Sequence, residues 1–304
     1  MSITAKKILD TSLTAEGMFS NISNYFISSE LHVQENIKIL NSLLTELVSS
    51  VNFNELLEEL SFKTYSQWTR GMQVNADMWP VYVLSDESAM EGLRYKATST
   101  GISTISPATL NLKKGQSGTT RDGISWVCLG DWCEYILPEM FPDYKSLKPS
   151  TLVDFSRKLP MTAITDEIWQ RNKMYQVRSY TGYYQLRGDR LYLFPGYADG
   201  TVISGFYYSK LPVKDTDGIR KDEVSSNTDI VLLPDLLMTT GVAYKWLKDK
   251  GLAGTYEELE KTYNDFLLTY QAISKSGKVI NLGGADYTSY YSPLPAGDWN
   301  VTGY

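Results

Sequence analysis

The sequence predicts an α+β fold, in which segments from the N- and C-terminal parts form a helical bundle and an antiparallel β module is inserted between them. Two observations predict this class. Apolar residues recur at helical spacing near both ends of the chain, whereas the middle consists of short β-prone runs punctuated by glycine and proline. The length of 304 residues and the 42% hydrophobic content allow a sizeable core.

The N-terminal segment, residues 1–79, is expected to be helical. Its longest helix is predicted by apolar residues at spacings of three and four, which fall on one helix face. These residues are Val33, Ile37, Leu40, Leu44, Leu47 and Val51. Such a stripe usually packs into a core, so we interpret it as structural.

Two shorter helices are expected beside the long one. The first covers residues 3–13. Asn52 and Glu55 resemble a capping box, which predicts a second helix with an apolar side made by Leu56, Leu57 and Leu60. The single histidine, His32, falls next to the apolar stripe, and we expect a satisfied or surface side chain rather than a catalytic one.

The middle of the chain is expected to hold two β regions. Residues 80–135 form a small inserted module, in which Asp122-Gly123 predicts a hairpin turn. Residues 136–228 contain the clearest β segment. Its three β-prone runs are separated by turn signals and predict an antiparallel meander. The runs cover residues 183–187, 190–194 and 201–208.

Residues 229–275 are expected to form a helical hairpin. Pro234 suits the first turn of a helix over residues 235–250, and Gly251 can adopt the left-handed conformation after it. A capping box predicts that the next helix begins near Thr255, so the short connection should pack the two helices antiparallel. The apolar stripe of the second helix comprises Leu259, Tyr263, Phe266, Tyr270 and Ile273.

Residues 276–304 combine turn-forming glycine and proline with aromatic residues. Glycine and proline disfavour regular structure, whereas disordered segments are usually poor in aromatic residues. An extended C-terminal arm that docks on a partner accounts for both features, and so does a tail that folds back on its own domain. The aromatic residues are Tyr287, Tyr290, Tyr291, Trp299 and Tyr304.

The side-chain inventory disfavours an enzyme. The chain has 22 Tyr and 7 Trp but one His, and it contains no GxSxG, HExxH, P-loop or GxGxxG motif. Aromatic richness favours contact surfaces, so we expect no catalytic residue, cofactor or metal site. An alternative is a glycan-binding or glycan-hydrolysing protein, because carboxylates lie beside tryptophans. The residues concerned are Trp126, Asp131, Trp132, Glu134 and Glu139.

The two cysteines, Cys128 and Cys133, have no second pair to complete a zinc site. Two buried thiols are the expected state, with a disulfide as the alternative. No apolar segment approaches the ~18–20 residues of a membrane span, and no apolar run follows Lys6 and Lys7 near the start. We therefore expect a soluble protein made in a reducing compartment.

Charge is unevenly distributed along the chain. Residues 143–221 hold 13 basic and 8 acidic side chains, residues 1–79 hold 5 and 9, and residues 222–304 hold 6 and 11. A basic block therefore lies between acidic flanks. It is either a surface for nucleic acid or an acidic partner, or a solvated sheet face. No motif for sequence-specific DNA recognition occurs.

Two stretches of sequence resemble the head-to-tail connector proteins of tailed phages, the adaptors beneath the portal in short-tailed phages. "YYQLRGDRLYLFP" at residues 183–195, followed by "GTVISGFYYSKLPV" at residues 200–213, looks like the β core of that family. "NTDIVLLPDLLMTTGVAYKWLKDKGL" at residues 227–252 resembles its Leu-Leu-Pro helix start and Gly-Leu break. Residues 2–47 add a weaker match to the opening helices, so the resemblance covers roughly two-thirds of the chain.

Residues 95–130 resemble a small β module of various phage structural proteins, which read G-T-S-x-x-x-P, then G-T-T, then D-G-x-x-W. The matching positions are Ser103, Pro107, Gly118, Thr119, Thr120, Asp122, Gly123 and Trp126. The resemblance implies an inserted domain that projects from a ring and docks a tail fibre, or one that enlarges the contact between subunits. Trp126 and Trp132 are the residues expected to make that contact.

The family resemblance implies a structural virion protein and no enzyme. Twelve copies would form a ring that joins the portal to the tail, and its lumen would pass double-stranded DNA without sequence specificity. The helical part would pack under the portal, and the aromatic residues of the C-terminal arm would bind it. Implied partners are the portal, a nozzle or tube protein and tail fibres, with no membrane, at the head–tail junction after synthesis in the host cytoplasm. The alternative within the virion is another tail component, such as a nozzle or tube subunit.

Overall fold

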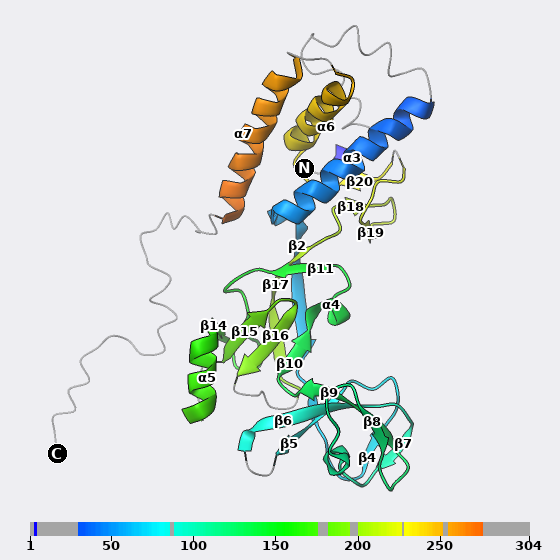
Figure 1. Ribbon diagram of the computed structural model, residues 1–304, viewed down its shortest axis with the longest axis vertical. Coiled ribbons are helices and arrows are strands. Elements are labelled where there is room, and N and C mark those ends of the chain that lie inside the picture. The colour runs from blue at the N-terminus through cyan, green and yellow to red at the C-terminus, as the bar shows by residue number, and fades with distance from the viewer. Residues whose placement is uncertain are drawn as a thin grey trace, which may run out of the picture.

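The computed structural model describes residues 3–4, 30–85, 88–175, 182–194, 200–226, 228–251 and 255–275 (Figure 1). The chain has a mixed α+β fold. Its buried apolar side chains form three clusters, one at the helical end, one in the central β region and one in a small β module. The helical end and the β module lie at opposite ends of the long axis, with the central region between them (Figure 1).

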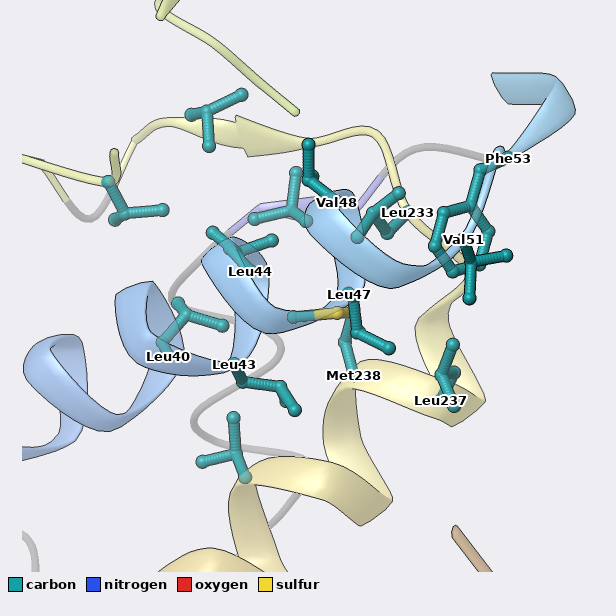
Figure 2. Close-up of a cluster of buried hydrophobic side chains, with 14 of the residues drawn as sticks. Leu40, Leu43, Leu44, Leu47, Val48, Val51, Phe53, Leu233, Leu237 and Met238 are labelled. Carbon is teal, nitrogen blue, oxygen red and sulfur yellow. The ribbon is translucent and has the colours of Figure 1, made fainter. Parts of the chain in front are cut away.

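Three helices form the helical end: α3 (Glu30–Ser50), α6 (Asp235–Asp249) and α7 (Thr255–Lys275). The predicted apolar stripe on α3 is confirmed where the structure describes it. Leu40, Leu44 and Leu47 of the stripe are fully buried. Leu43, which the stripe did not include, is fully buried as well, and Leu43 and Leu47 point toward α6 (Figure 2). This packing stabilises the helical end, because each buried leucine removes apolar surface from water worth about 1.5–3 kcal/mol.

The predicted hairpin of α6 and α7 is confirmed. The helices pack antiparallel, with the rings of Tyr244 and Tyr263 5.1 Å apart, and Gly251 follows α6 with a φ of +68°. Pro234 occupies the N-cap of α6 rather than its first turn. Gly241 lies where the three helices meet, since a Cβ there would come within 2.6 Å of a methyl carbon of Leu43.

A small antiparallel sheet closes the helical core. Its strands, in spatial order, are β1 (Ile3–Thr4), β20 (Ile230–Val231), β18 (Val213–Lys214) and β19 (Arg220–Lys221). Val213 and Val231 are fully buried against the helices. The helix predicted over residues 3–13 is therefore wrong at residues 3 and 4, and residues 5–13 lie outside the described residues.

The helix predicted from the capping box at Asn52 is also wrong. A single 3-10 turn, η1 (Asn54–Leu56), leads into strand β2 (Leu57–Lys63). From Glu59 to Lys63 burial alternates along β2, with Leu60 and Phe62 buried between exposed neighbours, so the period is two rather than 3.6. The long-range pairing of β2 with a distant strand outweighs the local capping signal. The segment 1–79 is therefore helical in only part of its described length.

Strand β17 (Val202–Ser209) lies at the centre of the middle region. It pairs along its length with β2, and also with β11 (Tyr144–Leu147) and β12 (Val153–Asp154). β13 (Leu159–Pro160) extends this sheet beyond β12. A second sheet has the order β10 (Glu134–Ile136), β16 (Arg190–Phe194), β15 (Tyr183–Arg187) and β14 (Thr162–Ala163), with helices α4 (Leu137–Met140) and α5 (Asp166–Tyr175) nearby.

The meander predicted for residues 183–208 is wrong in its third strand. β15 and β16 form the expected hairpin, but β17 belongs to the other sheet. The register of β17 with β2 joins all seven residues from Val202 to Tyr208. This pairing buries Ile203 and Tyr207 in the central core, which a neighbour of β16 would not achieve. The region 136–228 is accordingly divided among three sheets.

The small β module begins earlier than the predicted boundary at residue 80, because its strands cover residues 66–131. One sheet has the order β3 (Ser66–Gln67), β5 (Val81–Ser85), β6 (Ser88–Ala97), β9 (Ser125–Asp131) and β8 (Ser117–Thr119). A second pairs β4 (Met72–Val74) with β7 (Gly101–Ser103), and η2 (Pro107–Leu110) follows. The predicted turn at Asp122-Gly123 is confirmed: it joins β8 to β9, with a φ of +84° at Gly123.

Candidate interaction surfaces

Trp126 and Trp132, which were predicted to contact a fibre or a neighbouring subunit, are buried within the chain itself. Trp126 is fully buried in the module core, and Trp132 is 6% exposed. The rings of Trp132 and Tyr82 lie 4.8 Å apart. The prediction is wrong because the alternation of β9 places Trp126 on the same inward face as Cys128. Neither indole therefore offers a surface to a partner.

Glu134, the first residue of β10, is the centre of a buried polar cluster. Its carboxylate is 2% exposed. Oε2 accepts from Lys114 Nζ at 3.0 Å and from Arg94 Nη2 at 3.2 Å. Oε1 accepts from the guanidinium of Arg190 and from the hydroxyl of Tyr192 at 3.2 Å. We call these five residues the Glu134 cluster.

The Glu134 cluster joins the small β module to the central region. Arg94 lies on β6 and Lys114 precedes β8, whereas Glu134 and Arg190 lie on β10 and β16. Burial opposes ionisation of Glu134, but hydrogen bonds from Lys114 and Arg190 and the charge of Arg94 outweigh it, so the pKa of Glu134 lies below its ordinary value. An ionised carboxylate held by three cations ties the two parts together.

The residues that suggested a glycan site do not form one in this structure. A general acid must stay protonated near its working pH, and the lowered pKa of Glu134 precludes this. Asp131 lies at the exposed end of β9, and Glu139 lies on the short helix α4. Because Trp126 and Trp132 are buried, they cannot form an aromatic platform for a sugar ring.

Both cysteines are free thiols in this structure. Cys128 is buried as expected, but Cys133 is only half-buried. Within the described ranges, no group of three or more His, Cys, Asp or Glu side chains is placed to hold a metal ion.

A groove of about 780 Å³ lies where the end of α3 meets β11, the loop after it and α7. Lys145 and Lys148 are the charged residues of its wall, and the described lining contains no carboxylate. We call this hollow the lysine groove. Hydroxyl groups make up much of the rest of the wall, from Ser49, Ser50, Ser146, Ser150, Thr151 and Tyr208.

The two ammonium groups of the lysine groove have no carboxylate partner in the part of the chain that the structure describes. Lys145 Nζ donates to the carbonyl oxygen of Val51 at 2.6 Å, just beyond the C-terminal end of α3. Burial lowers the pKa of Lys145 below its ordinary value. A helix C-terminus attracts a cation, but a neutral carbonyl does not cancel its charge.

Large apolar side chains are also exposed in each of the three regions. Examples are Ile102 on β7 at 62%, Phe206 on β17 at 43% and Leu268 on α7 at 63%. Phe206 lies on the outer face of its sheet, because the alternate residues Ile203 and Tyr207 point into the core. Such residues are common singly on protein surfaces, and they offer apolar contact area to a neighbouring molecule.

Other predicted residues cannot be placed. The residues expected to bind the portal lie outside the described residues, as does the whole predicted arm 276–304. They are Tyr287, Tyr290, Tyr291, Trp299 and Tyr304. His32 falls on α3, within a stretch whose side chains are not described.

Comparisons with known proteins identify no family for this chain. No family model matches it, and a search of curated proteins gives no significant match. None of the described helices is both long enough and apolar enough to cross a membrane.

Proposed function

We propose that the protein is a ring-forming adaptor of a tailed-phage virion, which joins the portal to the tail and lines the channel for DNA ejection. The observation that carries this proposal is the serial arrangement of three cores along one axis (Figure 1). A subunit of this shape presents different surfaces at its two ends. An adaptor needs this property, because it binds one partner above and another below.

The resemblance to connector proteins agrees with this arrangement. Residues 183–213 and 227–252, which carry the resemblance, supply β15, β16 and β17 in the central region and α6 at the helical end. In the proposed assembly the N- and C-terminal segments form a helical bundle that packs under the portal. Residues 276–304 form the extended arm that binds the portal, and twelve copies complete the ring.

The β module has a defined place in the proposal. The Glu134 cluster fixes the module to the central region through a buried ion pair between Arg94 and Glu134. A fixed module transmits force and keeps its orientation, as a docking point for a tail fibre or a neighbouring subunit requires. Because Trp126 and Trp132 are buried, that contact uses other side chains, of which Ile102 is an exposed example.

Co-expression with the portal protein of the same virion tests the proposal. We expect the two proteins to copurify as one large complex, with the chain in several copies around one portal. A chain that stays monomeric at high concentration and never copurifies with the portal would sink the proposal.

Deleting residues 277–304 tests the arm separately. We expect the shortened chain to fold with an unchanged circular dichroism spectrum but to lose attachment to the portal. Normal attachment of the shortened chain would show that the arm is not the anchor.

A further inference from the structure

The lysine groove is a concave surface at which the positive charges of Lys145 and Lys148 have no ion-pair partner in the described chain. Elsewhere in the basic block 143–221 several cations have partners within the chain. Arg157 pairs with Asp154, Arg190 with Glu134 and Lys221 with Asp229. Lys145 and Lys148 face a hollow of about 780 Å³ without such a partner in the described chain. An uncompensated pair of ammonium groups in a groove attracts an anion.

The adjoining hollow shows the contrast. It shares Lys145 and Ser49 with the lysine groove, but its wall also contains Lys210, Asp222 and Glu223. Two lysines there share a wall with two carboxylates, so the lining of that hollow is balanced. Of the two hollows, Lys148 lines only the lysine groove, whose described lining contains no carboxylate.

The part of the chain's own α7 that lines the groove contains no carboxylate. Gln271 lines the groove, and the exposed carboxylates of Glu257 and Glu258 lie at the other end of the same helix. A separation of 13 residues corresponds to about 20 Å along the axis of an α-helix. Acidic groups on α7 of one copy are thus free to meet the groove of another.

We propose that the lysine groove binds an acidic segment of a second copy of this chain, of which the first turn of α7 is one such segment. This inference rests on the proposed ring. The charge distribution supplies complementarity, because both lysines of the groove belong to the basic block while the flanks 1–79 and 222–304 carry an excess of carboxylates. In a head-to-tail ring every copy presents both surfaces, and opposite charges fix which faces meet.

Charge reversal in the full chain tests the inference. The groove variant carries Lys145→Glu and Lys148→Glu. The matched control carries Lys96→Glu and Lys113→Glu, two exposed lysines of the module, so both variants change the net charge equally. Sedimentation velocity measures self-association at low and high salt, and unfolding curves check that both variants fold.

We expect the groove variant to weaken self-association at least tenfold at low salt, while the control associates as the unmodified chain does. We also expect salt to weaken association of the unmodified chain. Equal association of all three proteins would overturn the groove inference and leave the proposed ring intact. An unmodified chain that stays monomeric would contradict the ring and the second-copy occupant together.

A direct binding measurement separates the ligand classes. The probes are labelled hexaglutamate and a labelled 20-base-pair DNA duplex, each titrated into the full chain. The inference expects hexaglutamate to bind, with at least tenfold loss in the groove variant and none in the control. Binding of the duplex alone would assign the groove to nucleic acid and overturn the proposal, and binding of neither probe would overturn it as well.

Discussion

The Glu134 cluster and the lysine groove use the same kinds of charged side chain in opposite ways. In the cluster, one buried carboxylate is held by Arg94, Lys114 and Arg190. In the groove, Lys145 and Lys148 share a wall whose described lining contains no carboxylate. The first charge set is complete within one chain, whereas we propose that the second is completed by another copy.

This difference distinguishes charged residues that stabilise the fold from charged residues that are available to bind another molecule. Removing one partner of a buried ion pair leaves an unpaired buried charge, which lowers the free energy of unfolding. A complete cluster such as that of Glu134 therefore stabilises the region around it. Half-exposed lysines keep much of their hydration and contribute little to folding. We therefore expect substitutions in the cluster to lower stability and substitutions in the groove to alter binding.

The largest expected effect comes from Glu134→Gln. This change leaves Arg94, which is 3% exposed, without a counter-charge. We expect the free energy of unfolding to fall by about 3 kcal/mol, the usual cost of breaking a buried ion pair. Urea unfolding followed by tryptophan fluorescence measures it. A loss below about 0.5 kcal/mol would show that the cluster does not stabilise the junction.

Removing both charges of the Arg94–Glu134 pair should restore much of the stability that Glu134→Gln loses. The double variant Arg94→Met with Glu134→Leu leaves no buried charge, and Lys114 and Arg190 are half-exposed and can remain hydrated. We expect it to regain about 2 kcal/mol relative to Glu134→Gln. The same urea experiment measures the difference. A double variant as unstable as Glu134→Gln would mean that packing, rather than charge, sets the cost.

The sequence predicted the elements whose signals are local. The stripe on α3, the α6–α7 hairpin and the turn at Asp122-Gly123 all follow from spacing, capping or turn residues within a few positions. The sequence-based prediction was wrong for elements whose structure depends on pairing between distant segments. β2 became a strand because it pairs with β17, more than 140 residues away in the case of Ser61 and Ser204.

The functional residues were predicted less well for the same reason. Trp126 and Trp132 look like surface residues when aromatic richness is the only signal. In the structure, Trp126 lies on the inward face of β9 and Trp132 packs against Tyr82. The Glu134 cluster joins residues as far apart as Arg94 and Arg190, a grouping that no motif spacing reveals. The basic block did contain a usable signal, because both lysines of the groove belong to it.

Asp122 is a carboxylate that is stabilised mainly by hydrogen bonds. Partial desolvation opposes ionisation of Asp122, but hydrogen bonds from Thr120 and from the amides of Ile105 and Thr104 lower its pKa to about 2 from 3.8. Its stabilising effect is therefore present above pH 3.8 and is lost as the pH falls through about 2.

The variant Asp122→Asn tests this dependence. It should be less stable than the unmodified chain at pH 7, and the gap should narrow as the pH falls from about 4 to 2. Urea midpoints measured at several pH values give the comparison. A gap that stays constant over that range would exclude ionised Asp122 as the cause.

The smallest expected effect on stability comes from the groove. Replacing Lys145 with Met and Lys148 with Ala should lower the free energy of unfolding by no more than about 1 kcal/mol, because neither side chain has an ion pair in the described chain and the substitutions remove only the hydrogen bond from Lys145 to the carbonyl of Val51. The same variant should lose binding to hexaglutamate. A loss of stability as large as that of Glu134→Gln would contradict the view that the groove lysines serve binding rather than folding.

Electron microscopy of the full chain mixed with the portal protein of its virion tests the central claim most directly. The account predicts closed rings of the chain on one face of the portal, with the helical end against the portal and the β modules away from it. Single copies of the chain beside bare portals, at concentrations where both proteins are folded, would contradict it.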